Sequence, residues 1–165
     1  PRSTLFPYTT LFRSRDLDES ISSTLSFNES SKPAGTDKAD RINVTFSNRT
    51  DTRKFKYNAD DKSYHTNDWE TDVKFKNIIV LMDESEYITT PYKGGSTTYL
   101  NYKYKGGDGY YASKGTKTAI KWGVKDGKLV LTDVNGQELK LNVGRSYIAF
   151  ASTNHEGKVT FEVNE

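Results

Sequence analysis

Residues 119–136 read AIKWGVKDGKLVLTDVNG, and they carry the clearest structural pattern in the chain. Apolar side chains stand at every second position through Ile120, Trp122 and Val124, and polar or small residues stand between them. This period of two is typical of a β-strand that buries one face and exposes the other. We therefore expect Trp122 to lie in the core.

The turns that follow these runs are equally distinctive. Asp126-Gly127 and Asn135-Gly136 each separate two alternating runs, and such dipeptides tolerate the positive φ angles of tight hairpin turns. The pattern continues through residues 137–143 and, after Gly144, through residues 146–151. The last third of the chain therefore predicts an antiparallel meander of about four strands.

The same periodicity extends toward the N-terminus. Apolar residues alternate with polar ones from residue 42, and residues 77–82, NIIVLM, contain an unbroken apolar run typical of a central strand covered on both faces. Residues 84–96, with Pro91 and two glycines, predict a longer connection before another strand at 97–105. No long segment has the helical period of about 3.6. We expect an all-β fold, an antiparallel, meander-rich sandwich or partly open barrel.

By composition the chain divides into four parts. Residues 1–14, PRSTLFPYTTLFRS, resemble the in-frame translation of a common short-read sequencing adapter and are taken as an artefact outside the fold. Residues 15–40 are rich in Ser, Asp, Glu and Lys and predict a linker or irregular segment. Residues 41–151 form the expected β domain. Residues 152–165 form a tail with room for one extra strand.

Charge, cysteine content and hydropathy exclude several function classes. The chain has 24 Lys and Arg residues against 22 Asp and Glu, and without Arg2 and Arg13 of the adapter-like segment both numbers are 22. A nucleic-acid-binding protein ordinarily carries a basic surface, which this balance does not supply. There is no cysteine, hence no disulfide or thiolate, as in many secreted Gram-positive proteins. No apolar run approaches the ~18 residues of a membrane span, so we expect none in this chain.

Four motifs follow one another in a characteristic order. They are the strand Asn77-Ile78-Ile79-Val80, the turn Gly106-Gly107-Asp108-Gly109, the block Ile120-Lys121-Trp122 and the run DVNGQELKLNVGRSYI at residues 133–148. Together they resemble the C-terminal domain of the YerB-like lipoproteins, also known as domain of unknown function 3048, over about residues 42–151. Tyr57-Asn58 replaces the usual Tyr-Asp of that family, and Tyr147 stands where Trp is usual.

The resemblance implies a location more than an activity. Members are similar to secreted lipoproteins of mostly Gram-positive bacteria, anchored through an acylated N-terminal cysteine that this fragment lacks. The resemblance also implies a larger N-terminal domain outside the fragment, with which we expect contacts. We therefore expect an extracytoplasmic domain whose partners are envelope proteins or cell-wall polymer, and not nucleic acid.

No group of residues predicts catalysis, a cofactor or a metal site. His65 is flanked by acids, among them Asp61 and Asp72, and could bind a metal or polarise Ser63. Zinc sites usually require more nitrogen or sulfur ligands, so a polar loop between two strands is the simpler interpretation. We predict no catalytic, cofactor-binding or metal-ligating residue.

Tyrosines are the one feature that suggests binding. Six of them lie between residues 92 and 111, interleaved with lysines. A tyrosine on a sheet surface offers a flat apolar face and a hydroxyl, which suit sugars or protein interfaces, although a strand tyrosine can equally pack in the core. The alternation leaves Tyr99 and one of Tyr110 and Tyr111 for solvent, and we predict surface binding by Tyr99, Tyr110 and Tyr111.

We therefore expect a non-catalytic extracytoplasmic domain of a bacterial lipoprotein, not an enzyme, that acts through protein or cell-envelope contacts. Two alternatives stay open. One is a module that binds carbohydrate or an anionic polymer through Tyr99, Tyr110 and Tyr111. The other is an accessory domain of an enzyme whose catalytic half lies outside this fragment.

Overall fold

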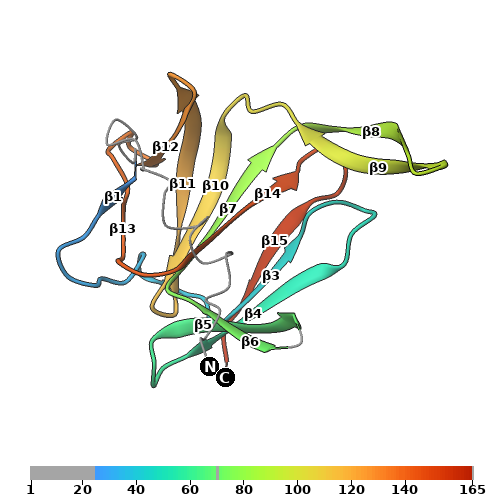
Figure 1. Ribbon diagram of the computed structural model, residues 1–165. Coiled ribbons are helices and arrows are strands. Elements are labelled where there is room, and N and C mark those ends of the chain that lie inside the picture. The colour runs from blue at the N-terminus through green and yellow to red at the C-terminus, as the bar shows by residue number, and fades with distance from the viewer. Residues whose placement is uncertain (1–24, 70, 165) are drawn as a thin grey trace, which may run out of the picture.

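The computed structural model describes residues 25–69 and 71–164 of the 165-residue chain (Figure 1). These residues form strands and turns, with no helix among them and hence none that could span a membrane. The strands are β1 (Ser26–Phe27), β2 (Asp37–Lys38), β3 (Arg41–Thr45), β4 (Thr52–Asn58), β5 (Ser63–Trp69), β6 (Thr71–Phe75), β7 (Asn77–Asp83), β8 (Ser85–Tyr92), β9 (Gly95–Tyr102), β10 (Gly107–Ser113), β11 (Thr116–Lys125), β12 (Lys128–Asp133), β13 (Lys140–Leu141), β14 (Ser146–Ser152) and β15 (Lys158–Glu162). The all-β prediction is confirmed.

Strand β7 is the centre of the larger sheet, whose order is β12-β11-β10-β7-β14, with β2 beside one end of β11. All of its side chains except that of Met82 are buried. β10 pairs with it antiparallel, and β14 pairs with it parallel, from Ser146 opposite Asn77 to Ser152 opposite Asp83. The predicted central strand is therefore confirmed.

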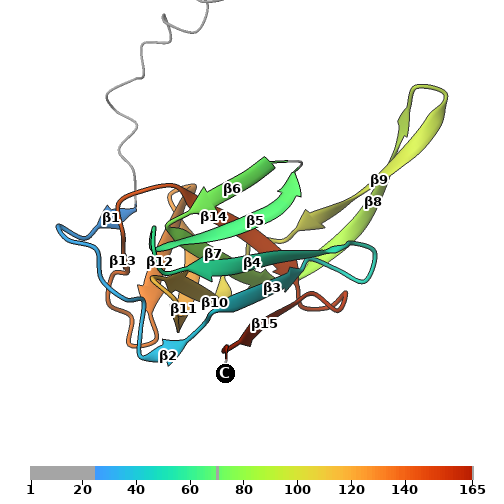
Figure 2. The same ribbon diagram turned by 90° about the horizontal axis from the view of Figure 1, so that it is seen from below.

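The smaller sheet has the order β15-β3-β4-β5-β6 and is antiparallel throughout. Its strands alternate as a half-buried sheet requires: Ile42 and Val44 of β3 are buried, whereas Arg41 is exposed. Seen from below, the smaller sheet lies over the larger one (Figure 2). The two layers form a sandwich, one of the two architectures that the sequence predicts.

Apolar side chains cover both faces of the larger sheet. Between the sheets, Phe55 and Tyr64 belong to one buried cluster with Ile78 and Val80 of β7. A second buried cluster lies on the opposite face and consists of Ile79, Leu81, Tyr111, Ile120, Trp122, Leu131 and Leu141. Each fully buried aliphatic side chain contributes about 1.5–3 kcal/mol, so the clusters together hold the larger sheet from both sides.

The last third of the chain departs from the predicted meander. Strands β10, β11 and β12 pair antiparallel in sequence order, as predicted. Strand β14, however, pairs with β7 and forms the opposite edge of the sheet from β12. Strand β12 ends in a tight turn at Asp133, whose carboxylate accepts the backbone N–H groups of Asn135 and Gln137 at 2.8 Å each. Among the described residues, a single isolated bridge, between Thr132 and Glu138, follows this turn.

The two segments outside the predicted domain also contain strands. Residues 25–40, at the end of the predicted linker, include β1, which pairs parallel with β13, and β2, which pairs with β11. The predicted tail includes β15, which pairs with β3 and completes the smaller sheet. The described part of the fold therefore extends beyond residues 41–151 at both ends.

A buried polar network fixes the N-terminal segment to the larger sheet. The side-chain amide of Asn77 donates to the backbone oxygen of Asn142 at 2.8 Å and to Ser146 Oγ at 3.0 Å. The Asn142 side chain accepts the backbone N–H of Lys32 at 2.8 Å and donates to the Lys32 carbonyl at 2.6 Å. Buried polar groups need hydrogen-bond partners. Asn77 and Asn142 therefore fix the position of the segment around Lys32, between β1 and β2, and of the loop between β13 and β14.

Candidate functional site

The most prominent surface feature is a two-stranded arm, residues 85–102, formed by β8 and β9. It extends away from the two sheets (Figures 1 and 2). β8 and β9 pair along their whole length and, among the described strands, only with each other. The turn has positive φ angles of 44° at Lys93 and 78° at Gly94, as a two-residue type I′ hairpin requires.

This arm corrects the prediction that residues 84–96 are a connection. Its strands are rich in β-branched residues, which favour extended backbone, and the hydroxyls of Thr89 and Thr98 lie 2.8 Å apart across the pair. Pro91 weakens the sequence signal because it lacks an N–H, but an edge strand tolerates proline. The sequence signal for this hairpin is Lys93-Gly94 between two β-branched runs.

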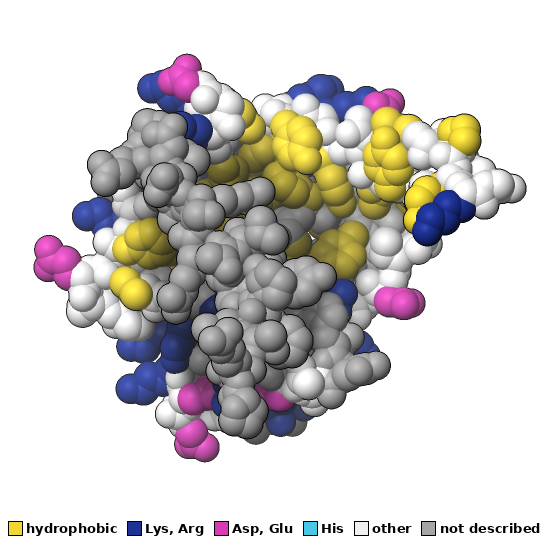
Figure 3. Space-filling view, viewed as in Figure 1, with side chains coloured by type: hydrophobic (Ala, Val, Ile, Leu, Met, Phe, Trp, Pro, Cys, Tyr) yellow, Lys and Arg dark blue, Asp and Glu magenta, His cyan; other side chains and the backbone are white. Residues whose placement is uncertain are grey.

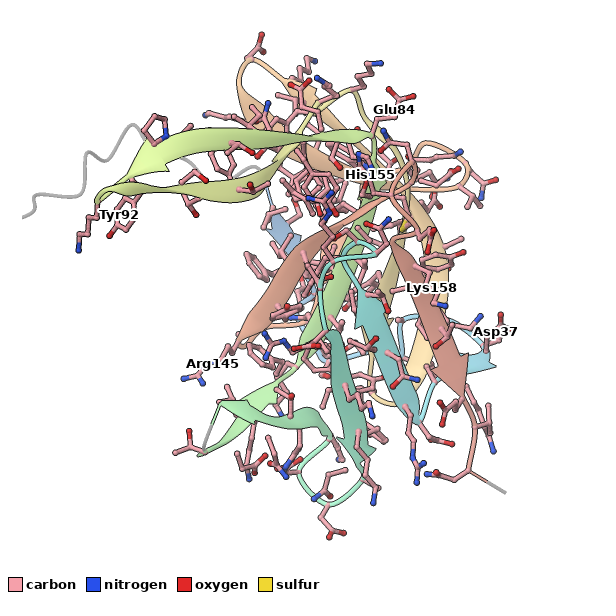
Figure 4. All side chains as sticks on the ribbon, turned by 90° about the vertical axis from the view of Figure 1, so that its right-hand side faces the viewer. Asp37, Glu84, Tyr92, Arg145, His155 and Lys158 are labelled. Atoms are coloured by element: carbon pink, nitrogen blue, oxygen red, sulfur yellow. The ribbon has the colours of Figure 1, made fainter. Side chains whose placement is uncertain are left out.

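Buried hydrogen bonds fix the base of the arm. The N–H of Ser85 donates to Asn154 Oδ1 at 2.9 Å, and its hydroxyl donates to Ser152 Oγ at 2.6 Å. On the neighbouring strand, the Asp83 carboxylate accepts the backbone N–H of Tyr104 at 2.6 Å. The arm is therefore anchored to β7 and to the connection between β14 and β15 (Figure 4).

Aromatic rings pack around Phe150 at the same base. Its ring centroid lies 5.2 Å from Tyr102, 5.3 Å from Tyr104 and 5.2 Å from Trp122. The Tyr102 hydroxyl donates to the backbone oxygen of Phe150 at 3.0 Å. Burial, with a smaller effect of nearby phenolic and acidic groups, raises the pKa of Tyr102 to about 12, so this hydroxyl stays a hydrogen-bond donor at neutral pH.

Three tyrosines of the arm and its base expose about half of their surface: Tyr92 (57%), Tyr99 (48%) and Tyr104 (55%). We call them the arm tyrosines. Tyr92 lies at the end of the arm, where the ammonium group of Lys93 is 5.1 Å from its ring centroid (Figure 4). Figure 3 shows hydrophobic side chains along this edge of the molecule. Exposed tyrosines are enriched at surfaces that bind other proteins.

The three tyrosines predicted from the sequence do not share a surface. Tyr99 is exposed on the arm, as predicted. Tyr110 is half-buried on β10, 5.3 Å from the ring of Phe161. Tyr111 points to the other face of β10, is 3% exposed and donates its hydroxyl to Asn77 Oδ1 at 2.9 Å. Tyr111 therefore has a structural role and is not available for surface binding.

A second candidate surface is the solvent face of the smaller sheet. It forms an open depression of about 1260 Å³. Polar and charged side chains from all five strands and from the turn before β4 line it, among them Arg41, Asn43, Thr45, Asp51, Thr52, Lys54, Lys56, His65, Asp72, Lys158, Thr160 and Glu162. We call this surface the polar hollow.

At one end of the polar hollow, His65 lies between two carboxylates. Its Nε2 is 2.8 Å from Asp61 Oδ2 and its Nδ1 is 3.0 Å from Asp72 Oδ2, while Lys74 Nζ is also 3.0 Å from Asp61 Oδ2. Ser63 instead donates its hydroxyl to the backbone oxygen of Asp61 at 3.2 Å. Because both ring nitrogens face carboxylates, His65 is not placed to activate Ser63. The described residues contain no group of acidic and histidine side chains suited to a metal ion.

This cluster predicts a loss of stability in acid. Partial burial acts to raise the pKa of Asp61, but hydrogen bonds from Lys74 and His65 lower it overall from 3.8. A depressed folded-state pKa adds stability above the unfolded-state value, and this contribution is lost as pH falls through the folded-state value. We therefore expect the difference in unfolding free energy between the unmodified chain and Asp61→Asn to shrink from about pH 6 to about pH 3 in urea titrations. A constant difference over this range would contradict the assignment.

Comparison with known proteins gives one family and one related structure. The family described as "Protein of unknown function (DUF3048) C-terminal domain" matches residues 38–148. The crystal structure of YerB protein from Bacillus subtilis is similar, with a TM-score of 0.58 and 18% sequence identity. The match covers 82% of this chain but 46% of the YerB chain, so this chain spans less than half of that protein's length. At this identity the likeness shows a shared fold alone. Among curated proteins none matches this sequence.

Proposed function

This chain belongs to the family of DUF3048 C-terminal domains, and from that membership we propose that it is a non-catalytic, extracytoplasmic domain of a bacterial lipoprotein that acts through protein contacts. The membership confirms the resemblance seen in the ordered motifs from residue 77 to residue 148. The lipid anchor and the location outside the cytoplasm are inferred from that family resemblance. The cysteine-free composition is compatible with them.

The arm is the observation that supports a role in protein contacts. A two-stranded hairpin by itself is at best marginally stable in water, so an arm held only at its base favours a partner that covers it. The outer edges of β8 and β9 pair with no other described strand, so they offer backbone donors and acceptors to an added strand. The arm tyrosines add apolar contact area beside these edges.

A polypeptide partner fits the arm better than a carbohydrate does. Carbohydrate platforms use neighbouring aromatic rings that lie on one surface. Tyr99 and Tyr111 do not share a surface, because Tyr99 is exposed on the arm and Tyr111 is buried in the larger sheet. The unpaired strand edges, by contrast, match the backbone of another protein chain.

Replacing both Tyr92 and Tyr99 by serine is expected to weaken binding to envelope proteins at least about tenfold, because exposed aromatic anchors supply much of the energy of protein interfaces. The unfolding free energy should change by less than about 0.5 kcal/mol, because both side chains are largely exposed. Binding is measured with the immobilised chain and a solubilised envelope-protein fraction of a Gram-positive bacterium.

The matched control replaces Val134 and Val143, which are 59% and 71% exposed and lie outside the arm, by serine. This control should bind like the unmodified chain. The proposal fails if both double variants bind equally well, or if binding survives digestion of the envelope proteins by a protease.

A further inference from the structure

The two long edges of the arm differ in the backbone groups that they present. In an antiparallel pair, opposite residues alternate between pairs that exchange hydrogen bonds and pairs whose N–H and C=O groups point outward. Ser85 fixes this alternation, because its N–H donates to Asn154 Oδ1 and its carbonyl accepts Asn154 Nδ2, at 2.9 Å each. Its backbone groups therefore point away from β9. By the register, every second residue from Ser85 to Pro91 points outward on β8. The same holds on β9 from Ser96 to Tyr102.

The outer edge of β8 is blocked near both ends, whereas that of β9 is open. On β8, Asn154 occupies the backbone groups of Ser85, and Pro91 has no N–H to donate. The edge of β9 contains no proline, and each of its outward residues has an N–H and a C=O: Ser96, Thr98, Leu100 and Tyr102. An added strand therefore fits the side of β9.

β9 also lacks the charged residues that protect most exposed edges. Natural sheets guard such edges with lysine, other charges or proline. The edge strands β6, β12 and β15 carry Asp72, Lys128 and Lys158. Residues 95–102, GSTTYLNY, carry no charge, and the following Lys103 is 2.6 Å from Glu86 of the same arm. An uncharged strand lies beside a copy of itself without the repulsion of like charges.

The edge strand β14 is uncharged as well, but two of its backbone groups already have partners. The carbonyl of Phe150 accepts the Tyr102 hydroxyl at 3.0 Å. The N–H of Ser152 donates to the carbonyl of Phe46 at 2.8 Å. The edge of β9 is thus the better place for another strand.

The sequence of β9 matches itself in one antiparallel register. With Tyr99 opposite Tyr99 of a second copy, Thr98 lies opposite Leu100, and Ser96 lies opposite Tyr102. All four outward residues of each strand then exchange hydrogen bonds, about eight in total. The two Tyr99 side chains form a non-hydrogen-bonded pair, where side chains approach most closely and aromatic pairs stabilise a sheet. Moving the twofold axis by one residue in either direction leaves fewer such pairs.

We propose that the chain forms a twofold dimer in which the β9 strands of two arms pair antiparallel around Tyr99. The resulting sheet has the order β8-β9-β9-β8. The arm extends away from the two sheets, so two copies can meet at their arms (Figures 1 and 2). A twofold contact is closed and self-complementary, and it adds strands to a hairpin that is marginally stable alone. The inference rests on the role in protein contacts proposed for the arm, and it names a second copy as the partner.

Sedimentation velocity of the full chain from about 5 μM to about 500 μM tests the dimer, whose Kd we expect on the order of 10–100 μM because the interface is small. Thr98→Lys places a charge on the β9 edge and should raise the Kd at least about tenfold. The matched control is Thr89→Lys. Thr89 is exposed like Thr98, lies opposite it and shares the same hydroxyl contact, but belongs to the β8 edge. This control should dimerise like the unmodified chain.

Single cysteines test the register, because the chain has none of its own. In the proposed dimer, Tyr99→Cys brings two thiols together at a Cα separation of about 4.5 Å, which a disulfide can span. Oxidised glutathione should therefore cross-link this variant into a covalent dimer. Ile88→Cys is the matched control, since Ile88 lies opposite Tyr99 on β8. It should remain largely uncross-linked.

A chain that stays monomeric over the whole concentration range overturns the proposal. So does an equal loss of dimer in the two lysine variants, or equal cross-linking of the two cysteine variants. If a monomeric chain binds envelope proteins and loses this binding on replacement of Tyr92 and Tyr99, the role of the arm stands and the second copy is excluded as its partner. Dimerisation as described without binding of envelope proteins supports this inference and contradicts the envelope partners alone.

Discussion

Replacement of Asn77 by alanine is expected to lower the free energy of unfolding by about 3–5 kcal/mol. Asn77 is fully buried, and its Oδ1 accepts the Tyr111 hydroxyl at 2.9 Å and the N–H of Asn142 at 3.2 Å. Its amide donates to the Asn142 carbonyl and to Ser146. Alanine would deprive these buried groups of their shared partner, and each unsatisfied group costs about 1–3 kcal/mol. Urea unfolding measures the loss.

Two further variants separate this network from a general effect of removing an asparagine. Asn67 is exposed on β5, so Asn67→Ala should change the unfolding free energy by less than about 0.5 kcal/mol. Tyr111→Phe removes one hydroxyl and should cost about 1–2 kcal/mol. Because Tyr111 and Asn77 share a hydrogen bond, their effects should be non-additive in a double-mutant cycle. Equal losses at positions 67 and 77, or additive losses in the cycle, would refute the network.

Replacement of Gly157 by alanine is expected to destabilise the protein by at least about 3 kcal/mol. An added Cβ would lie 2.3 Å from the backbone nitrogen of Ser152, 2.6 Å from its carbonyl oxygen and 2.7 Å from the carbonyl oxygen of Phe46. These atoms cannot move away easily, because Ser152 N–H donates to the Phe46 carbonyl at 2.8 Å and Gly157 N–H donates to Ser152 at 2.7 Å. The clash lies where the chain passes from β14 of the larger sheet to β15 of the smaller one.

The control for this prediction is Gly123→Ala on β11. An added Cβ there meets no atom within 4 Å, and the backbone does not have a positive φ. We expect a neutral or slightly stabilising effect, because alanine restricts the unfolded chain more than glycine does. Thermal unfolding of the two variants side by side is sufficient. Similar melting temperatures for both would show that the approach at Gly157 is looser than described.

The arrangement of apolar residues was sufficient to predict most strands. The unbroken run at 78–82 predicted a strand covered on both faces, and β7 is that strand. The alternation around Trp122 predicted its burial, and it is 5% exposed. The Asp126-Gly127 turn joins β11 and β12 as expected. These predictions succeeded because each depends only on neighbouring residues in the sequence and on which side of a strand faces solvent.

The candidate surfaces could be predicted only in part. Alternation showed that Tyr110 and Tyr111 point to opposite faces of their strand, but both faces of the larger sheet are covered, so neither is fully exposed. Arg41, Lys56, His65 and Lys74 lie in a row across four strands of the smaller sheet, and no spacing in the sequence indicates it. Gly157 likewise has no signal in its local sequence, because the atoms that exclude a side chain belong to distant residues.

Local pattern alone settled that this chain is built from β-strands and where most of them lie, since these depend on a period of two and on the φ angles that turns allow. Packing in three dimensions settled the rest. It placed β14 beside β7, directed the arm away from the two sheets and brought lysines of separate strands into one hollow. Which strands pair depends on the burial of whole sheet faces and on hydrogen bonds between residues distant in sequence. No short stretch of sequence contains either kind of information.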